Sequence, residues 1–316
     1  MQKTGHQLPS NSARRALDIL GDRWTLMILF HAFRGRRRFE TFQSQTGMAR
    51  SLLTGRLSRL VDAGVLRREQ YQGRPPRYEY RLTAMGVDLF GASLMIIRWE
   101  KIWFPDAETA AHRLHHKCGH LITPELRCEA CGEIVTARTI QVADGPGAGL
   151  EPPQPPRVQR RSTVLRDAID PDRQMLERAM EVLGDRWTAH VIASAFTGVR
   201  KFGEFESELG VAPNILSERL NRLVDLGIFD RRLYQEKPER FEYRLTAKGI
   251  DLFPLIVELI SWGDRWLDGG KGPRQILTHS SCGHRLVPMI TCDHCHEVVT
   301  VTSTRLTEDQ RVSAQR

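Results

Sequence analysis

Apolar residues in the first hundred positions recur every three or four residues in some stretches and in short extended runs in others. Leu53, Leu57 and Leu60 illustrate the helical spacing, because they would form one buried stripe along a helix that stops at Gly64. The pattern after that glycine consists of two short runs around a turn rich in proline and glycine. The predicted elements, in order, are helices within 16–33 and over 40–45 and 51–63, strands over 65–71 and 77–82, and a long helix over 84–104.

These elements follow the order helix, turn, helix and two-stranded hairpin. A turn containing Gly47 separates the two short helices, and it has the length expected of a helix-turn-helix motif. The hairpin that follows would be the wing of a winged helix. The sequence therefore predicts a mainly α fold with small β wings, in the α+β class.

The whole pattern occurs twice in the chain. The segment 20–25, Leu-Gly-Asp-Arg-Trp-Thr, recurs 163 positions later at 183–188, and the stretch between the copies is rich in glycine and proline. A unit of this length indicates duplicated domains joined by a linker. The predicted boundaries are 1–142 for the first domain (winged helix 12–104, cysteine segment 112–142), 143–166 for the linker, and 167–316 for the second domain (winged helix 175–267, cysteine segment 276–306).

Four blocks of the first copy, each repeated in the second, carry a family resemblance. They are 17–25, 38–42, 53–64 and 78–86, and they resemble the HxlR-type winged helix-turn-helix regulators. The resemblance implies binding to double-stranded DNA, dimerisation through terminal helices and, most often, repression. Two such domains in one chain would make a fused dimer, with further self-association and a small-molecule effector as open possibilities.

The resemblance also implies which residues of the first copy meet DNA. The second helix of the motif enters the major groove, and its outward side chains meet base edges. Arg50 would contact guanine there, while cations before the motif and on the wing would contact phosphates. The candidate DNA-binding residues of the first copy are Arg37, Arg38, Arg50, Ser51, Thr54, Ser58, Arg74 and Arg77.

The second copy carries the opposite charge. Residues 1–104 contain 18 basic and 8 acidic residues, a net charge of +10, whereas residues 171–268 contain 14 and 17, a net charge of −3. Because DNA affinity rests largely on neutralising phosphates, we expect the first domain to be the stronger reader. The second either reads a half-site weakly or serves only as the partner of the first. Its candidate residues are Asn214, Ser217, Asn221, Lys237 and Arg240.

Two further sets of repeated residues favour structural roles. Arg56 and Arg219 precede buried leucines, and they would either contact DNA or pair with a nearby acid. The six tryptophans fit the core or the interface between copies better than the stacking of a ligand. They are Trp24, Trp99, Trp103, Trp187, Trp262 and Trp266.

All six cysteines follow the winged helices, in two groups of three with the same spacing. A gap of two residues lets one tight turn present two ligands to a metal, and three cysteines with one histidine form a closed tetrahedral set that suits structural zinc. Reduced, metal-free thiols are the alternative. The predicted ligands of the two zinc ions are His115, Cys118, Cys128 and Cys131 in the first copy, and His279, Cys282, Cys292 and Cys295 in the second.

The fourth ligand of each set is open to choice. Two residues separate His115 and His279 from the cysteine that follows each, which matches the spacing of the paired cysteines. This spacing favours them over His120 and His284. His294 has no counterpart in the first copy and is expected at the surface.

The composition narrows the classes of function. The chain has 46 basic and 38 acidic residues, and no uncharged apolar run approaches the ~18 residues of a membrane span. With no signal-peptide core at the N-terminus, a cytoplasmic protein that joins the nucleoid when bound to DNA is expected.

The leading hypothesis is a sequence-specific regulator that binds double-stranded DNA, with repression as its expected mode. The alternative is a protein-interaction scaffold whose DNA binding has partly decayed. An enzyme is not expected, because neither cysteine group leaves an open metal position beside a general base.

Overall fold

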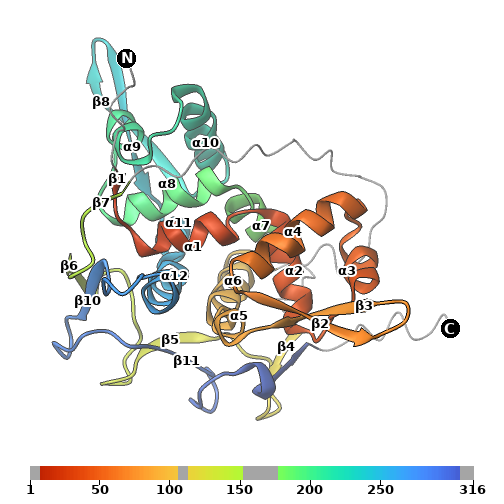
Figure 1. Ribbon diagram of the computed structural model, residues 1–316. Helices are drawn as coiled ribbons and strands as arrows, with labels where there is room; N and C mark the ends of the chain where they lie inside the picture. Colours follow the sequence, from red (N-terminus) through yellow and green to blue (C-terminus); the bar gives the residue numbers. More distant parts are fainter. Residues whose placement is uncertain (1–7, 106–112, 152–176, 307–316) are drawn as a thin grey trace.

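The computed structural model describes residues 8–105, 113–151 and 177–306 (Figure 1). Helices form the body of the molecule, and every sheet in the described part of the chain has two strands. This arrangement confirms the predicted mainly helical fold with small β wings. The predicted linker lies outside the described residues from 152 onward.

The first copy begins with two helices where the sequence shows one apolar pattern. Asn11 caps the first by accepting a hydrogen bond from the backbone N–H of Arg14, and Asp22 caps the second in the same way from Trp24 and Thr25. The elements are α1 (Ser12–Leu20), α2 (Arg23–Phe33), α3 (Phe39–Thr46), α4 (Arg50–Asp62), β2 (Leu66–Gln72), β3 (Arg77–Leu82), α5 (Ala84–Val87) and α6 (Phe90–Trp103).

The second copy repeats this order. Gly47 and Gly210 adopt left-handed backbone conformations, with φ of 63° and 61°, and each closes the turn of a helix-turn-helix. Figure 1 shows the two wings at opposite ends of the molecule. The elements are α7 (Glu177–Leu183), α8 (Arg186–Phe196), α9 (Phe202–Leu209), α10 (Pro213–Asp225), β8 (Phe229–Glu236), β9 (Glu239–Leu245), α11 (Ala247–Ile250) and α12 (Phe253–Trp266).

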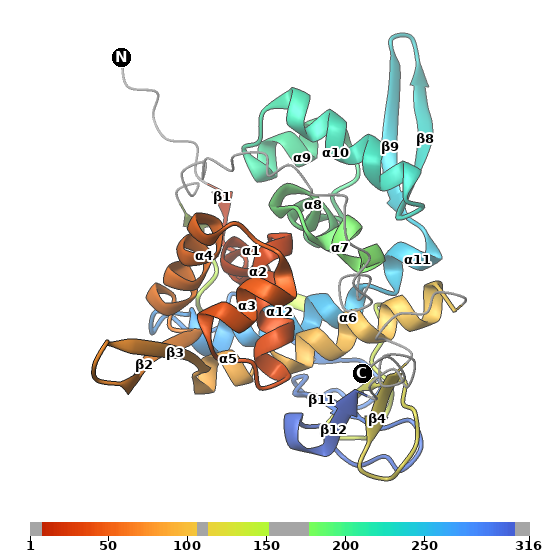
Figure 2. The ribbon, with the colours of Figure 1, turned by 90° about the vertical axis from the view of Figure 1, so that its right-hand side faces the viewer.

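The cysteine segments of the two copies form one shared module. Each strand from one copy pairs antiparallel with a strand from the other, in the pairs β4–β12, β5–β11 and β6–β10. Figure 2 shows β11, β12 and β4 gathered below α6. The strands are β4 (Leu114–His116), β5 (Glu125–Cys128), β6 (Ile140–Asp144), β10 (Gln275–His279), β11 (Pro288–Thr291) and β12 (Thr304–Leu306), while β1 (Leu8–Pro9) pairs with β7 (Leu150–Glu151).

The long helices α6 and α12 join the copies through matched tryptophan contacts. Trp99 and Trp262 are buried, and each donates a hydrogen bond of 2.9 Å to a backbone carbonyl of the other copy, at Lys248 and Met85 respectively. Trp103 and Trp266 donate in the same reciprocal way to the carboxylates of Asp251 and Asp88. These four tryptophans therefore hold a pseudo-dimer together within one chain.

A second matched pair of contacts links helices α4 and α10 to the aspartates that cap α2 and α8. Arg56 lies 3.1 Å from the Asp22 carboxylate, and Arg219 lies 2.7 Å from that of Asp185. The two aspartates also face each other in an antiparallel backbone bridge. Both arginines therefore pair with an acid inside the protein, which is the structural one of the two roles that the sequence allows.

The carboxylic acid of Glu258 lies half-buried between the long helices. Glu258 of α12 packs against Gly91 of α6, where a Cβ atom would come within 2.3 Å of its carboxylate oxygen. Burial, with a smaller contribution from the nearby charge of Asp88, raises the pKa of Glu258 to about 8 against the opposing charge of Arg265. The acid is therefore mostly neutral at pH 7.

The variant Glu258→Gln should make stability less dependent on pH. The pKa of Glu258 in the folded protein lies above its ordinary value of 4.5. The contribution of this carboxyl to the free energy of unfolding is therefore complete below pH 4.5 and is lost as the pH rises toward about 8. At pH 8 the variant should be more stable than the parent by about 1–3 kcal/mol, and at pH 5 the gap should close. Urea unfolding at both pH values measures this, with exposed Glu129→Gln as control. An equal offset at the two pH values would contradict it.

Candidate nucleic-acid interface and metal centres

Helix α4 presents its polar side outward, as the apolar stripe predicts. Leu53 and Leu57 are fully buried and Leu60 is 1% exposed. The opposite positions are all exposed to solvent, and they are Arg50, Ser51, Thr54, Gly55 and Ser58. This is the surface that a recognition helix needs, since its outward side chains must reach base edges.

Two contacts orient the exposed side chains of α4. The Arg50 guanidinium lies over the Phe39 ring, 4.9 Å from its centroid, which holds the cation at the start of the helix. The Thr54 hydroxyl donates a 2.8 Å hydrogen bond to the Arg50 carbonyl, so its free lone pairs are left to accept from a ligand.

The wing and the segment before α3 lie beside each other, and both carry exposed arginines. Arg74 and Arg77 are exposed at the tip of the β2–β3 hairpin. The carbonyl of Arg37 accepts a hydrogen bond from the backbone N–H of Tyr80, and the Arg38 guanidinium lies 4.9 Å from the Tyr71 ring centroid. Arg37 and Arg38 are thus attached to the wing, and their exposed side chains extend its basic surface.

The second copy presents a similar shape with different chemistry. Pro213 stands where the first copy has Arg50, at the first turn of α10. Glu204 caps α9 by accepting from the backbone N–H groups of Arg200 and Lys201, and Glu218 lies 2.8 Å from Arg219. Two of the acids near this motif therefore have internal partners. The predicted residues Asn214, Ser217, Asn221, Lys237 and Arg240 are all exposed.

The shared module brings the cysteines together in two clusters. Among the described residues, two groups of four side chains have their ligand atoms all within 4.8 Å of one another. One group is His116, Cys118, Cys292 and Cys295, and the other is Cys128, Cys131, His279 and Cys282. Each group therefore contains three sulfur atoms and one imidazole nitrogen, the donor set that favours zinc.

The spacing of the donor atoms matches a tetrahedral site. Zn–S bonds of about 2.3 Å place two sulfurs at the corners of a tetrahedron about 3.8 Å apart. Cys118 and Cys292 lie 3.8 Å apart at Sγ, and Cys128 and Cys282 lie 3.9 Å apart. The imidazole Nδ1 of His116 lies 3.4 Å from Cys295 Sγ, and that of His279 lies 3.3 Å from Cys131 Sγ. Both clusters could therefore hold a metal ion with little rearrangement.

The expected ligand His115 is corrected to His116. Side chains alternate along β4, where His116 is buried and faces the cluster while His115 is only half-buried. The first copy has one residue between histidine and cysteine, and the second has two, so equal spacing selects the wrong histidine. His120 and His284 lie outside both clusters.

The pairing of the segments also differs from the expectation of one complete knuckle in each copy. Each cluster takes a histidine and a cysteine from one copy and a Cys-x-x-Cys pair from the other. The cause is the antiparallel pairing of β5 with β11, which sets Cys128 opposite Pro288 and carries each Cys-x-x-Cys turn across to the other copy.

Local backbone geometry supports the clusters. Backbone N–H groups at His120 and His284 contribute most to lowering the pKa of Cys118 and of Cys282 to about 6, whereas burial raises the pKa of Cys292 to about 11. The thiolate that binds metal is therefore favoured at one cysteine of each cluster. Gly132 has a φ of 74° after its Cys-x-x-Cys turn, and His296 takes the same left-handed conformation at the matching position, with a φ of 59°.

The helix-turn-helix, its exposed recognition helix and the basic wing define a winged helix-turn-helix protein. The HxlR-like helix-turn-helix family matches residues 19–108 and again 182–271. The chain belongs to this family of transcriptional regulators and carries two of its domains, as the sequence blocks indicated.

Two named relatives agree with this assignment in sequence. The chain is 48% identical over 123 residues to the uncharacterized HTH-type transcriptional regulator MT3179 of Mycobacterium tuberculosis, which covers 39% of this chain and 78% of that protein. It is 37% identical over 93 residues to the uncharacterized HTH-type transcriptional regulator YvaP of Bacillus subtilis, and the match covers 29% of this chain and 86% of that protein. Among solved structures, the crystal structure of PA1607, a candidate transcription factor, has 32% sequence identity to this chain and a TM-score of 0.38. The match covers 42% of this chain and 92% of that one.

Among the described residues, no helix has both the length and the apolar character needed to cross a membrane.

Proposed function

We propose that the chain is a sequence-specific regulator that binds double-stranded DNA as a pseudo-dimer and represses transcription by occupying promoter DNA. The observation that supports this most is the exposed side of α4, where Arg50 and three hydroxyl side chains face outward beside a basic wing. Such a surface suits both base edges and phosphates. The chain would act in the cytoplasm, at the nucleoid.

The first domain is proposed to bind DNA more strongly than the second. Pro213 cannot supply the guanidinium that Arg50 offers, and the second domain carries a net charge of −3 over residues 171–268. Asn214 and Lys237 remain exposed, so the second domain is expected to add a weaker half-site contact. Decayed binding by both domains would leave an interaction scaffold instead.

The two clusters are proposed to hold two structural zinc ions per chain. Three sulfurs and one nitrogen at tetrahedral spacing form a closed site, which leaves no position for substrate. Each ion would cross-link the two copies, and would thereby fix the distance between the recognition helices α4 and α10.

Two further kinds of partner, a second copy of the chain and a small-molecule effector, are also considered. Self-association is not required, because the long helices α6 and α12 already pair within the chain. A second chain would need another surface. A small-molecule effector would act by changing the relation between the two winged helices.

Footprinting of the intact chain on the DNA upstream of its own gene tests the proposal. At physiological salt we expect a strongly protected half-site and a weaker one about one helical turn away. Binding should weaken steeply as salt rises, because phosphate contacts release counterions. Salt-sensitive binding to every duplex, with no protected sequence, would contradict sequence-specific regulation and favour the scaffold.

A further inference from the structure

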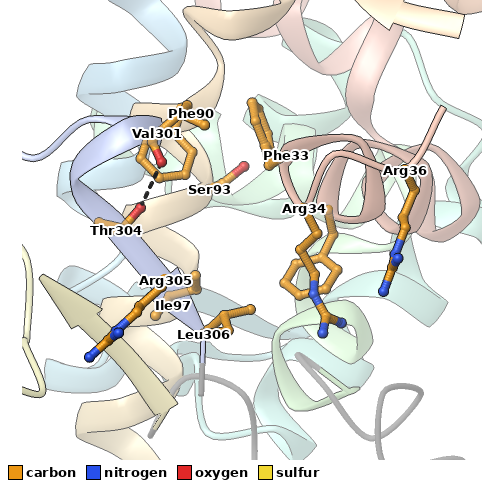
Figure 3. Close-up of a pocket in the computed structure, with 11 residues that line it drawn as sticks. Phe33, Arg34, Arg36, Phe90, Ser93, Ile97, Val301, Thr304, Arg305 and Leu306 are labelled. Carbon is orange, nitrogen blue, oxygen red and sulfur yellow. Dashed lines mark hydrogen bonds between the residues drawn. The ribbon is translucent and has the colours of Figure 1, made fainter. Parts of the chain in front are cut away.

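A cavity of about 340 Å³ lies between the first winged helix and the shared module of the cysteine segments. Phe33 from the end of α2 and Phe90 from α6 form part of its wall, with their ring centroids 5.2 Å apart. Ile97 of α6 and Leu306 of β12 add further apolar surface (Figure 3). Three elements that are distant in sequence, including one from the second copy, therefore contribute apolar side chains to this cavity.

Two arginines from the segment after α2 line the same cavity. Figure 3 shows Arg34 and Arg36 extending in the same direction from this segment, while Arg305 points away on the other side. Arg34 lies over the Phe30 ring, 5.7 Å from its centroid. The Nε atom of Arg36 is buried, with no hydrogen-bond partner among the described residues. A buried donor without a partner is costly, so a ligand that supplied an acceptor here would be stabilised.

The four arginines that follow α2, at positions 34 and 36–38, are therefore divided between two surfaces. Arg37 and Arg38 are exposed and attached to the wing, whereas Arg36 is half-buried beside the cavity. The four arginines, which the sequence presents as one run, have two different environments. Arg34 and Arg36 are therefore separate from the wing contacts that the DNA-binding proposal uses.

The second copy supports this division. At the positions that match Arg37 and Arg38 it has Arg200 and Lys201, so the cations beside the wing are present in both copies. At the positions that match Arg34 and Arg36 it has Thr197 and Val199. The charge is thus restricted to the cavity of the first copy, although the neighbouring Phe33 and Phe90 both have phenylalanine counterparts.

We propose that this cavity binds a small organic anion, a carboxylate carried on an aromatic or aliphatic body. Arg34 and Arg36 would hold the carboxylate, since a guanidinium can donate two parallel hydrogen bonds to it. The phenylalanine and aliphatic walls would cover the apolar body, and the cavity has the size of small-molecule sites in proteins.

The position of the cavity gives such a ligand a way to affect DNA binding. Arg34 and Arg36 stand between α2 and α3, and α3 leads directly into the recognition helix α4. The opposite wall belongs to β12, which pairs with β4 in the shared module. A bound anion would therefore contact both the DNA-reading unit and the module that joins the copies.

Isothermal titration of the intact chain with 4-phenylbutyrate tests the proposal, and the neutral 4-phenylbutyramide is the matched ligand control. We expect saturable binding of the acid with one site per chain, and binding of the amide that is weaker by about tenfold or more, the range expected for charge-assisted hydrogen bonds. This comparison needs no variant. Equal binding of the two, or no binding of the acid, would overturn the proposal.

The double variant Arg34→Thr with Arg36→Val gives the second test, because it installs the residues of the second copy. Binding of the acid should fall by about tenfold or more, to the level of the amide. Arg305→Gln, which installs the residue found at the matching position 141 of the first copy, should leave binding within about twofold. Undiminished binding to the double variant would overturn the proposal.

Displacement by DNA separates this site from the DNA-binding surface. A duplex of unrelated sequence, added in excess at physiological salt, should leave the affinity for the acid within about threefold. Full competition by that duplex would assign Arg34 and Arg36 to phosphate contacts and would overturn the proposal. These readouts follow the acid directly, so they stand apart from the test of sequence-specific DNA binding.

Discussion

Replacing Arg50 and Arg74 together by alanine is expected to weaken binding of the intact chain to its specific duplex by roughly 100-fold. Arg50 is the exposed cation at the start of the recognition helix, held over the Phe39 ring, and Arg74 is exposed at the wing. Loss of a bidentate contact to a base costs about 1–3 kcal/mol, and loss of a phosphate contact adds to it.

The matched variant in the second domain is Asn214→Ala with Lys237→Ala. We expect it to weaken binding by less than about tenfold, because its surroundings are acidic and Pro213 replaces the arginine. Fluorescence anisotropy with both variants, over a series of salt concentrations, measures the difference. Equal losses would show that the two domains contribute equally, and would contradict the proposed order.

Much of the winged helix could be predicted because its signals are local. The stripe of Leu53, Leu57 and Leu60 gave α4 to within one residue at each end, and Gly47 marked the turn before it. Exposure of the opposite side followed from the same periodicity. The paired roles of Arg56 and Arg219 stayed open, since an ion pair with Asp22 or Asp185 depends on how distant segments pack.

The arrangement of the cysteine segments could not be predicted in the same way. Both copies contain both halves of a candidate metal-binding cluster, so the sequence allows pairing within a copy or between copies. The pairing of β5 with β11 decides between them, and it is a long-range contact with no local signal. The choice between His115 and His116 had a weak local signal, because only alternate residues of β4 face the cluster.

Removal of the metal is expected to destabilise the whole chain. Closed zinc sites contribute strongly to folding, and here each would join the two copies. After treatment with a chelator the midpoint of thermal unfolding should fall by about 10 °C or more, and excess zinc should restore it. Circular dichroism during heating measures this. An unchanged midpoint in protein shown to be metal-free would contradict a structural role for zinc.

The direct test of a cross-linked pseudo-dimer is the zinc content of two double variants. Cys118 and Cys292 belong to one cluster, whereas Cys118 and Cys128 belong to different clusters. We expect Cys118→Ser with Cys292→Ser to keep one zinc ion per chain, and Cys118→Ser with Cys128→Ser to keep none. The reverse result, with one ion kept when Cys118 and Cys128 are replaced, would show that each copy binds its own metal and would contradict a chain held together by shared zinc sites.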